Sequence, residues 1–223
     1  MINHSKLTNI LNSIQAKKVL VLGDIMLDQY IFGSVERISP EAPIPIINIK
    51  KTKYLTGGAG NVLKNLNSLN IKASFISIIG NDIAGKILKK NIEKLKNVEY
   101  ALLIDKNRKT TCKTRYMSDG QQLFRADDET IDAIDQTMKK KIFKYFQLFI
   151  KQTDIIIFSD YGKGIFLDNA FCQKLIKAAL KKIKKLLLTL KEIILKNIKG
   201  FSLLLPTQKK LLKQQKLTLL III

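Results

Sequence analysis

Lys17-Lys18-Val19-Leu20-Val21-Leu22-Gly23-Asp24 is the stretch that decides the fold class. Four consecutive aliphatic residues closed by Gly-Asp are typical of a buried parallel strand with a polar group at its carboxyl end. Similar apolar runs follow at 73–79, 99–104 and 154–158. We therefore expect four strands of one sheet.

Helical patterns separate these strands. Apolar residues recur with helical spacing at 61–69, 83–95, 137–150 and 168–179. Strands that alternate with helices predict an α/β fold with a mostly parallel central sheet between helix layers.

Two stretches break this alternation, at about 29–51 and 110–125. Pro40, Pro43 and Pro45 exclude a helix from the first. The second predicts a hairpin that turns at Ser118-Asp119-Gly120. Together they predict a small β layer, which is either a lid over a site at the strand ends or a surface for a partner.

Charge and composition exclude several functions. The net charge is +21. Residues 180–223 hold 11 Lys and one acid, Glu192, so residues 1–179 hold 28 bases and 17 acids, a net +11. Lysines on solvated helix faces explain this distribution better than a nucleic-acid partner does. No apolar run is long enough to cross a membrane, and Met1–Lys6 lacks a signal-peptide pattern.

The scarcity of histidine and cysteine narrows the chemistry. His4 is the one histidine, in a terminus that we expect to fray, which argues against Ser-His-Asp catalysis and His-ligated zinc. Cys112 and Cys172 form no C-x-x-C pair, and we expect them to be core residues of a reduced, cytoplasmic protein. We expect no metal site.

Polar residues gather where a ligand of an open α/β sheet binds, beyond the carboxyl ends of the strands. Asp24 and Asp28 follow the first strand, and Asp160, Tyr161 and Lys163 follow the fourth. Asp28 is either a turn cap or a ligand for a polyol such as a sugar, since a carboxylate can accept hydrogen bonds from two hydroxyls.

A glycine loop precedes the first predicted helix. Gly57-Gly58-Ala59-Gly60-Asn61 would let a ligand approach backbone N–H groups at the helix start, with the Asn61 amide beside them. The alternative is a tight turn that needs positive φ at a glycine.

The predicted hairpin carries further polar candidates. Arg115 lies on its first arm, and Gln121, Gln122 and Arg125 lie on its second. Arginine can pair bidentately with a phosphate, or each side chain can simply face solvent. The acidic run 127–129 predicts an exposed turn.

In this order the motifs resemble the heptose 7-phosphate kinases of the ribokinase-like (PfkB-type) sugar kinases. The resemblance covers about residues 16–179. It rests on these stretches: Gly23-Asp24-Ile25-Met26-Leu27-Asp28, Arg37-Ile38-Ser39-Pro40-Glu41-Ala42-Pro43-Ile44-Pro45, Gly57-Gly58-Ala59-Gly60-Asn61-Val62, Gly80-Asn81-Asp82 with Gly85, Thr110-Thr111-Cys112-Lys113, Gln121-Gln122-Leu123-Phe124-Arg125 and Ser159-Asp160-Tyr161-Gly162-Lys163-Gly164.

The resemblance implies ATP- and Mg²⁺-dependent phosphorylation of heptose 7-phosphate at its anomeric hydroxyl, for ADP-heptose and lipopolysaccharide core synthesis. It also implies a ribokinase-like three-layer sandwich with a β lid that can form a homodimer surface. Asp28 and Gly57-Gly58-Ala59-Gly60-Asn61 would hold sugar hydroxyls. Lys163 and Arg125 would contact the substrate phosphate, and Gln122 and Asp160 complete the substrate-binding set.

The chain departs from the family pattern after about residue 179. The family's Asp-Pro-Lys-Gly, Thr-Pro-Asn-x-x-Glu and Gly-Ala-Gly-Asp motifs, the last carrying the catalytic base, cannot be read here. Residues 180–223 contain 14 Leu, 7 Ile and 11 Lys. Suitable synonymous codons for Leu188–Leu195 and Leu204–Leu211, shifted by two bases, restore the first two motifs. We therefore expect a frameshift near 178–185, a sheet without its C-terminal strands, and no kinase activity.

Three alternatives remain open. The chain could belong to another PfkB-type kinase, for ribose or a nucleoside, which the Arg37–Pro45 run argues against. It could be a non-catalytic polypeptide, such as a pseudogene product or sugar-binding remnant. A nucleic-acid binder rests on charge alone.

Overall fold

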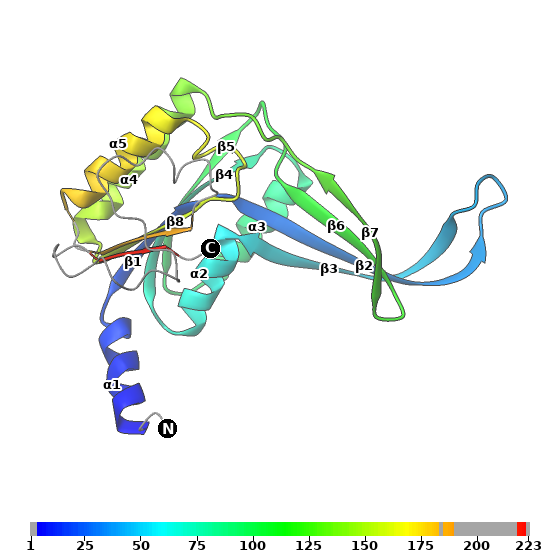
Figure 1. Ribbon diagram of the computed structural model, residues 1–223, viewed down its shortest axis with the longest axis horizontal. Helices are drawn as coiled ribbons and strands as arrows, with labels where there is room; N and C mark the ends of the chain where they lie inside the picture. The colour runs from blue at the N-terminus through cyan, green and yellow to red at the C-terminus, as the bar shows by residue number, and fades with distance from the viewer. Residues whose placement is uncertain (1–3, 183–184, 190–217, 222–223) are drawn as a thin grey trace, which may run out of the picture.

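The computed structural model describes residues 4–182, 185–189 and 218–221. Its central element is a six-stranded sheet (Figure 1). Its order is β10-β9-β8-β1-β4-β5, and all of its neighbouring strands are parallel. The four predicted strands are present as β1 (Lys18–Gly23), β4 (Lys72–Gly80), β5 (Val98–Asp105) and β8 (Ile155–Ser159). The α/β prediction is confirmed.

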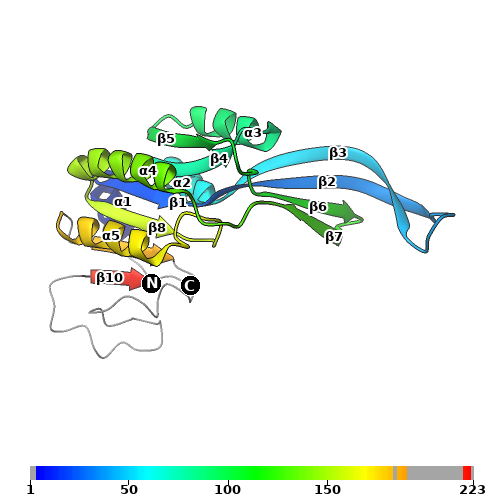
Figure 2. The ribbon, with the colours of Figure 1, turned by 90° about the horizontal axis from the view of Figure 1, so that it is seen from above.

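Alternation along β1 produces two separate cores. Val19 and Val21 pack under α2 (Ala59–Ser68) and α3 (Ile83–Glu93). Leu20 and Leu22 face the other way, toward α4 (Gln136–Phe149) and α5 (Asn169–Leu180). The sheet is therefore buried on both faces, as a parallel sheet requires, and Figure 2 shows the helices on its two sides.

Aspartate caps fix the start of three helices. The side chains of Asp82, Asp135 and Asp168 accept hydrogen bonds from backbone N–H groups in the first turns of α3, α4 and α5. Each bond satisfies a donor that has no partner within the helix, which typically stabilises a helix by about 1 kcal/mol. A short 3₁₀ turn, η1 (Ile150–Gln152), follows α4.

The predicted β layer is a four-stranded sheet of order β3-β2-β6-β7. It consists of β2 (Ile25–Ile38), β3 (Pro45–Gly58), β6 (Cys112–Ser118) and β7 (Gln121–Asp128), and it projects away from the three-layer body (Figure 1). Asp119 and Gly120 have φ of 51° and 80° at the hairpin turn. Positive φ at both central positions is the geometry of a type I′ turn, which suits a two-residue hairpin.

One expectation about the N-terminus was wrong: this segment is helical rather than frayed, since α1 spans His4–Gln15. Beyond β8, two short strands that the sequence did not predict extend the sheet. β9 (Lys185–Thr189) pairs with β8, and β10 (Thr218–Ile221) pairs with β9. The shifted-frame motifs fall mostly within 190–217, outside the described residues.

Candidate sugar-binding site

Asp28 and Gly57 meet where the β layer leaves the main sheet. Asp28 lies on β2 beside β3, and a Cβ at Gly57 would overlap Oδ2 of Asp28 and approach Cγ of Met26 to 2.9 Å. Only glycine leaves room for the carboxylate there. The structure therefore brings together the two candidates with the most specific predicted role.

Arg115 holds the other oxygen of Asp28. Its Nη1 donates to Oδ1 at 2.6 Å, and each side chain is 19% exposed. The guanidinium also lies over the Tyr30 ring, 5.2 Å from its centroid. Burial acts against the charge of Arg115, but the hydrogen bond and charge of Asp28 raise its pKa above the ordinary value.

Gly58 makes the turn into α2. Its φ is +59°, and a Cβ would overlap the carbonyl oxygen of Asp24, to which Ala59 N–H donates at 2.9 Å. The tight-turn interpretation of the glycine loop is thus confirmed at Gly58. Asn61 lies in the first turn of α2 with its side chain exposed, so its amide is accessible to a ligand.

Asp24 is buried beneath the loop that follows β8 and holds the backbone of that loop. Its carboxylate accepts hydrogen bonds from the backbone N–H groups of Tyr161, Lys163 and Ile165, at 3.0, 3.1 and 3.4 Å. Burial raises its pKa from 3.8 to about 6, although those hydrogen bonds oppose the shift. Asp160 is buried in the same loop and accepts from Gly162 N–H at 2.7 Å. Its negative charge contributes to this increase in the pKa of Asp24.

Lys163 links this loop to the β layer. Its Nζ donates to Glu129 at 2.5 Å, and Lys113 lies 3.9 Å from the other oxygen of Glu129. Lys113 in turn donates to Asp127 at 2.7 Å, and Arg125 pairs with Asp127 at 2.8 Å. The predicted turn at 127–129 was wrong, because Asp127 and Asp128 are the last two residues of β7. These two are exposed as predicted, but the Glu129 side chain is only 17% exposed.

Hydrogen bonds join the motifs around Gly80 and Thr110 into a second cluster, and this gives both motifs a structural role. Thr110 N–H donates to Asp82 at 2.7 Å, and Gly80 N–H donates to the Thr110 hydroxyl at 2.8 Å. Burial alone would raise the pKa of Asp82, but hydrogen bonds from Thr110 and Gly85 lower it below its usual value. Arg108, whose side chain is 8% exposed, donates to the backbone oxygens of Lys163 and Asp132.

Not every predicted residue lies close to Asp28. Gln122 pairs with Met117, which pairs with Phe32, four residues along β2 from Asp28. At about 3.3 Å per strand residue, Gln122 is displaced about 13 Å toward the free end of the layer. Arg125 is closer, paired across the strands with Arg115.

The roles of three charged residues at the centre of the site do not follow from the sequence pattern. Lys113 carries no predicted role, the predicted role of Arg115 is a phosphate contact, and Glu129 falls in a predicted exposed turn. One sequence pattern could have indicated their place in the site. Side chains alternate along β6, so Lys113 and Arg115 lie on the same face of the β layer as Asp28.

Comparison with known proteins identifies the family. Residues 16–200 match the model of the pfkB family carbohydrate kinases. The bifunctional protein HldE of Aliarcobacter butzleri is 41% identical over 192 residues, which covers 86% of this chain and 40% of that protein. HldE of Helicobacter pylori is 40% identical over 163 residues, or 73% of this chain and 35% of that protein. The chain thus spans about two fifths of the length of such relatives.

Solved structures support the fold. The phosphofructokinase-2 of Escherichia coli in complex with fructose-6-phosphate has a TM-score of 0.57 at 18% identity, and covers 78% of this chain and 55% of that one. A carbohydrate kinase from Agrobacterium tumefaciens has a TM-score of 0.57 at 19% identity, with 78% and 53% coverage. On the family match and the HldE relatives, the chain belongs to the pfkB family of carbohydrate kinases.

Proposed function

We propose that this chain is the sugar-binding part of an ATP-dependent kinase that phosphorylates heptose 7-phosphate at its anomeric hydroxyl. The product would feed ADP-heptose and lipopolysaccharide core synthesis. Support comes from the family, from the HldE relatives and from the Arg37–Pro45 run, which resembles the heptose kinases rather than the ribose or nucleoside kinases.

One observation carries the proposal: the Asp28 carboxylate is fixed between Arg115 and the side-chain-free Gly57 at the base of the β layer. A carboxylate held in one orientation can accept hydrogen bonds from two neighbouring sugar hydroxyls. Asn61 would add its amide. We assign the sugar hydroxyls to Asp28 and to the loop Gly57-Gly58-Ala59-Gly60-Asn61.

The basic residues around Asp28 suit the phosphate of the substrate. We assign this role to Lys163 and Arg125, with Gln122 and Asp160 completing the set. Lys163 and Arg125 are each paired with a carboxylate, Glu129 and Asp127 respectively. A dianionic phosphate would compete with those carboxylates for the two basic side chains. These side chains favour a phosphorylated sugar over a neutral one when their ion pairs rearrange to bind the phosphate.

Phosphoryl transfer itself needs groups that this polypeptide does not supply. The 223-residue sequence has no Gly-Ala-Gly-Asp motif for the catalytic base. In the described ranges no three His, Cys, Asp or Glu side chains converge on a metal position, so we assign no residue to Mg²⁺ and no step through ATP. We propose that the chain binds the sugar phosphate without turning it over.

Three further proposals accompany this function. A homodimer through the β layer is supported by exposed apolar side chains on β3 and β7, such as Ile49, Tyr54 and Phe124. A cytoplasmic setting is supported by two free thiols.

No helix among the described residues is long and apolar enough to cross a membrane. A shifted reading frame over 180–223 would be tested by the DNA, which should encode Asp-Pro-Lys-Gly in the alternative frame.

Titration calorimetry of the whole chain tests the proposed function. We expect saturable binding of heptose 7-phosphate, and at least tenfold weaker binding of ribose 5-phosphate and adenosine. Asp28→Asn should abolish heptose binding, because an amide replaces one acceptor oxygen by a donor and loses the pair with Arg115. Equal affinity for all ligands, or unchanged affinity of Asp28→Asn, would contradict the proposal. ATP-dependent turnover would contradict binding without transfer.

A further inference from the structure

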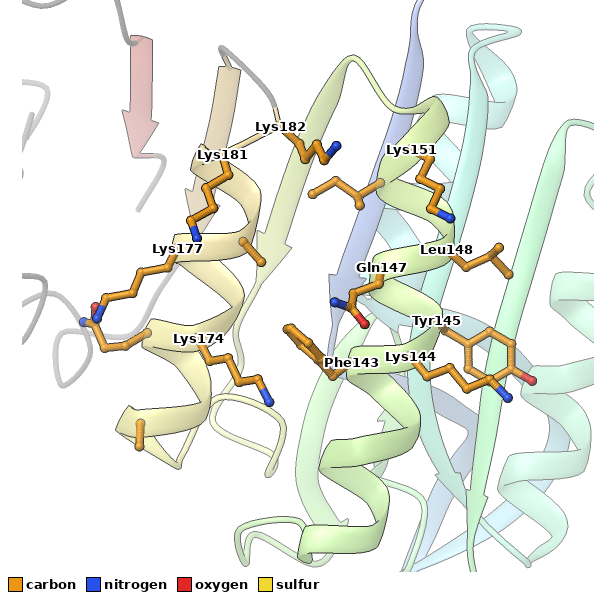
Figure 3. Close-up of a pocket in the computed structure, with 14 residues that line it drawn as sticks. Phe143, Lys144, Tyr145, Gln147, Leu148, Lys151, Lys174, Lys177, Lys181 and Lys182 are labelled. Carbon is orange, nitrogen blue, oxygen red and sulfur yellow. The ribbon is translucent and has the colours of Figure 1, made fainter.

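A groove lies between α4 and α5, and none of its lining residues belongs to the candidate sugar-binding site. The groove has a volume of about 1250 Å³, and residues of α4 and α5, the helices that cover one side of the sheet, line it (Figure 3). This volume exceeds the roughly 300–1000 Å³ of ordinary small-molecule pockets. Its form and size suit a polypeptide segment.

Lysines line both sides of this groove. Lys144 and Lys151 come from α4 and its 3₁₀ extension, and Lys174, Lys177, Lys181 and Lys182 come from α5 and the residues after it (Figure 3). Among the residues that the structure describes, no acidic side chain lines it. Within the described part of the chain, none of these six lysines has a carboxylate oxygen within 4.0 Å. The positive charge of the groove is therefore uncompensated by these residues.

Apolar groups lie between the lysines. Phe143 and Leu148 come from α4, and Ala178 comes from α5. Leu148 is 55% exposed, and Lys174 lies over the Phe143 ring at 4.1 Å from its centroid. An apolar strip flanked by one sign of charge is the complement of an amphipathic helix of the opposite charge.

Charge decides among the occupants. Residues 180–223 carry 11 Lys and one Glu, so this segment of the chain would be repelled, and a second copy of the same face would be repelled as well. A nucleic-acid duplex would meet the lysines but leave the apolar strip uncovered. A membrane surface is flat and cannot fill a groove between two helices.

We propose that the groove between α4 and α5 docks an acidic amphipathic helix of a partner protein. Its apolar stripe would cover Phe143 and Leu148, and its carboxylates would pair with Lys174 and Lys177. The groove is lined by residues within 143–151 on one side and 170–182 on the other, which is about 14 and 20 Å at 1.5 Å per residue. The longer side matches three to four turns of a partner helix.

A fluorescence anisotropy titration tests this docking. The probe is a labelled 14-residue helix, about the length of the groove, with leucines at helical i, i+3, i+7 spacing and glutamates on the flanks. We expect it to bind the whole chain, and a scrambled peptide of the same composition to bind at least tenfold more weakly. Lys174→Glu with Lys177→Glu should weaken binding of the striped peptide by about tenfold or more, which corresponds to about 1.4 kcal/mol.

The matched control reverses two lysines on the opposite helix layer. Lys86→Glu with Lys90→Glu on α3 changes the net charge equally and should leave affinity within about twofold. Equal losses in both double variants, equal binding of the scrambled peptide, or no binding of the striped peptide would overturn the proposal. Competition by a DNA duplex for the same lysines would assign the groove to nucleic acid instead. If Lys174→Glu with Lys177→Glu fails to fold by circular dichroism, Lys174→Gln with Lys177→Gln replaces it, with the same expected direction.

Discussion

Arg115 and Asp28 lie 87 positions apart in sequence but form a 2.6 Å charge-assisted hydrogen bond at the base of the β layer. β6 runs parallel to β2 with Arg115 opposite Tyr30, so the guanidinium reaches back over one residue to Asp28. Asp28 is the carboxylate that we assign to the sugar, and this pair connects it to β6, the strand that also carries Lys113. It makes the position of Asp28 depend on the β layer as a whole.

Removing Arg115 should weaken sugar binding through Asp28. With Arg115→Met, Asp28 loses its partner and can rotate, so we expect about tenfold weaker binding of heptose 7-phosphate by calorimetry. Arg115→Lys should recover part of the loss, because an ammonium keeps the charge without the planar fork. Lys109→Met is the control, because the Lys109–Asp128 pair is 64% and 67% exposed and contributes little. A matching loss in both Met variants would contradict a positioning role for Arg115.

Gly57 should not tolerate a side chain. In Gly57→Ala the new methyl group would overlap Oδ2 of Asp28, so we expect loss of heptose 7-phosphate binding and a drop in melting temperature. Gly120→Ala gives the comparison: its φ is +80°, but no atom of the described residues lies within 4 Å of a Cβ there. That variant should lose about 1 kcal/mol of stability and bind the sugar normally. Normal binding by Gly57→Ala would show that Asp28 can move without consequence.

The sequence predicted the β layer and the four main strands because each depends on a local pattern. Alternating or continuous apolar residues, the prolines at 40–45 and the Asp119-Gly120 turn act over a few positions. The existence and approximate bounds of the strands up to β8 were therefore accessible without any tertiary information.

The contacts inside the site were not accessible, because each joins distant segments. Nothing near Glu129 indicates that Lys163, 34 positions on, covers it, so three acids in a row predicted solvent exposure. Asp24 was weighed as a ligand, yet the structure places it under a loop 137–141 positions away in sequence. Side-chain pairing of this kind depends on strand order and register, which the pattern of one sequence does not determine.

Cys172 should be unreactive in the folded chain. Burial and, to a smaller extent, the charges of Asp160 and Asp168 raise the pKa of its thiol from 9.0 to about 12. At pH 8 the reactive thiolate is then about 10⁻⁴ of the population, against about one tenth for an ordinary cysteine with a pKa near 9. Iodoacetamide followed by peptide mass spectrometry should label Cys172 only after denaturant is added. Rapid labelling without denaturant would mean that α5 opens readily.

Asp24 should make the chain less stable as pH rises from about 4 to 6. Its folded pKa of about 6 lies above its ordinary value of 3.8, so in this window the folded state binds a proton more tightly than the unfolded state does. Stability gained from protonation is present below pH 4 and is lost as pH rises through 6. The shift of about two pKa units corresponds to about 3 kcal/mol.

The measurement is the free energy of unfolding in urea of wild type and Asp24→Asn at several pH values. The wild-type value minus the value for Asp24→Asn should fall by up to about 3 kcal/mol between pH 4 and pH 7, because the variant has no carboxyl to titrate at this position. Asp82, Asp127 and Asp168 have lowered pKa values and act in the opposite direction, but below about pH 4, and they are common to both proteins. A constant difference across this range would mean that Asp24 titrates normally and that the loop 160–165 does not exclude water from it.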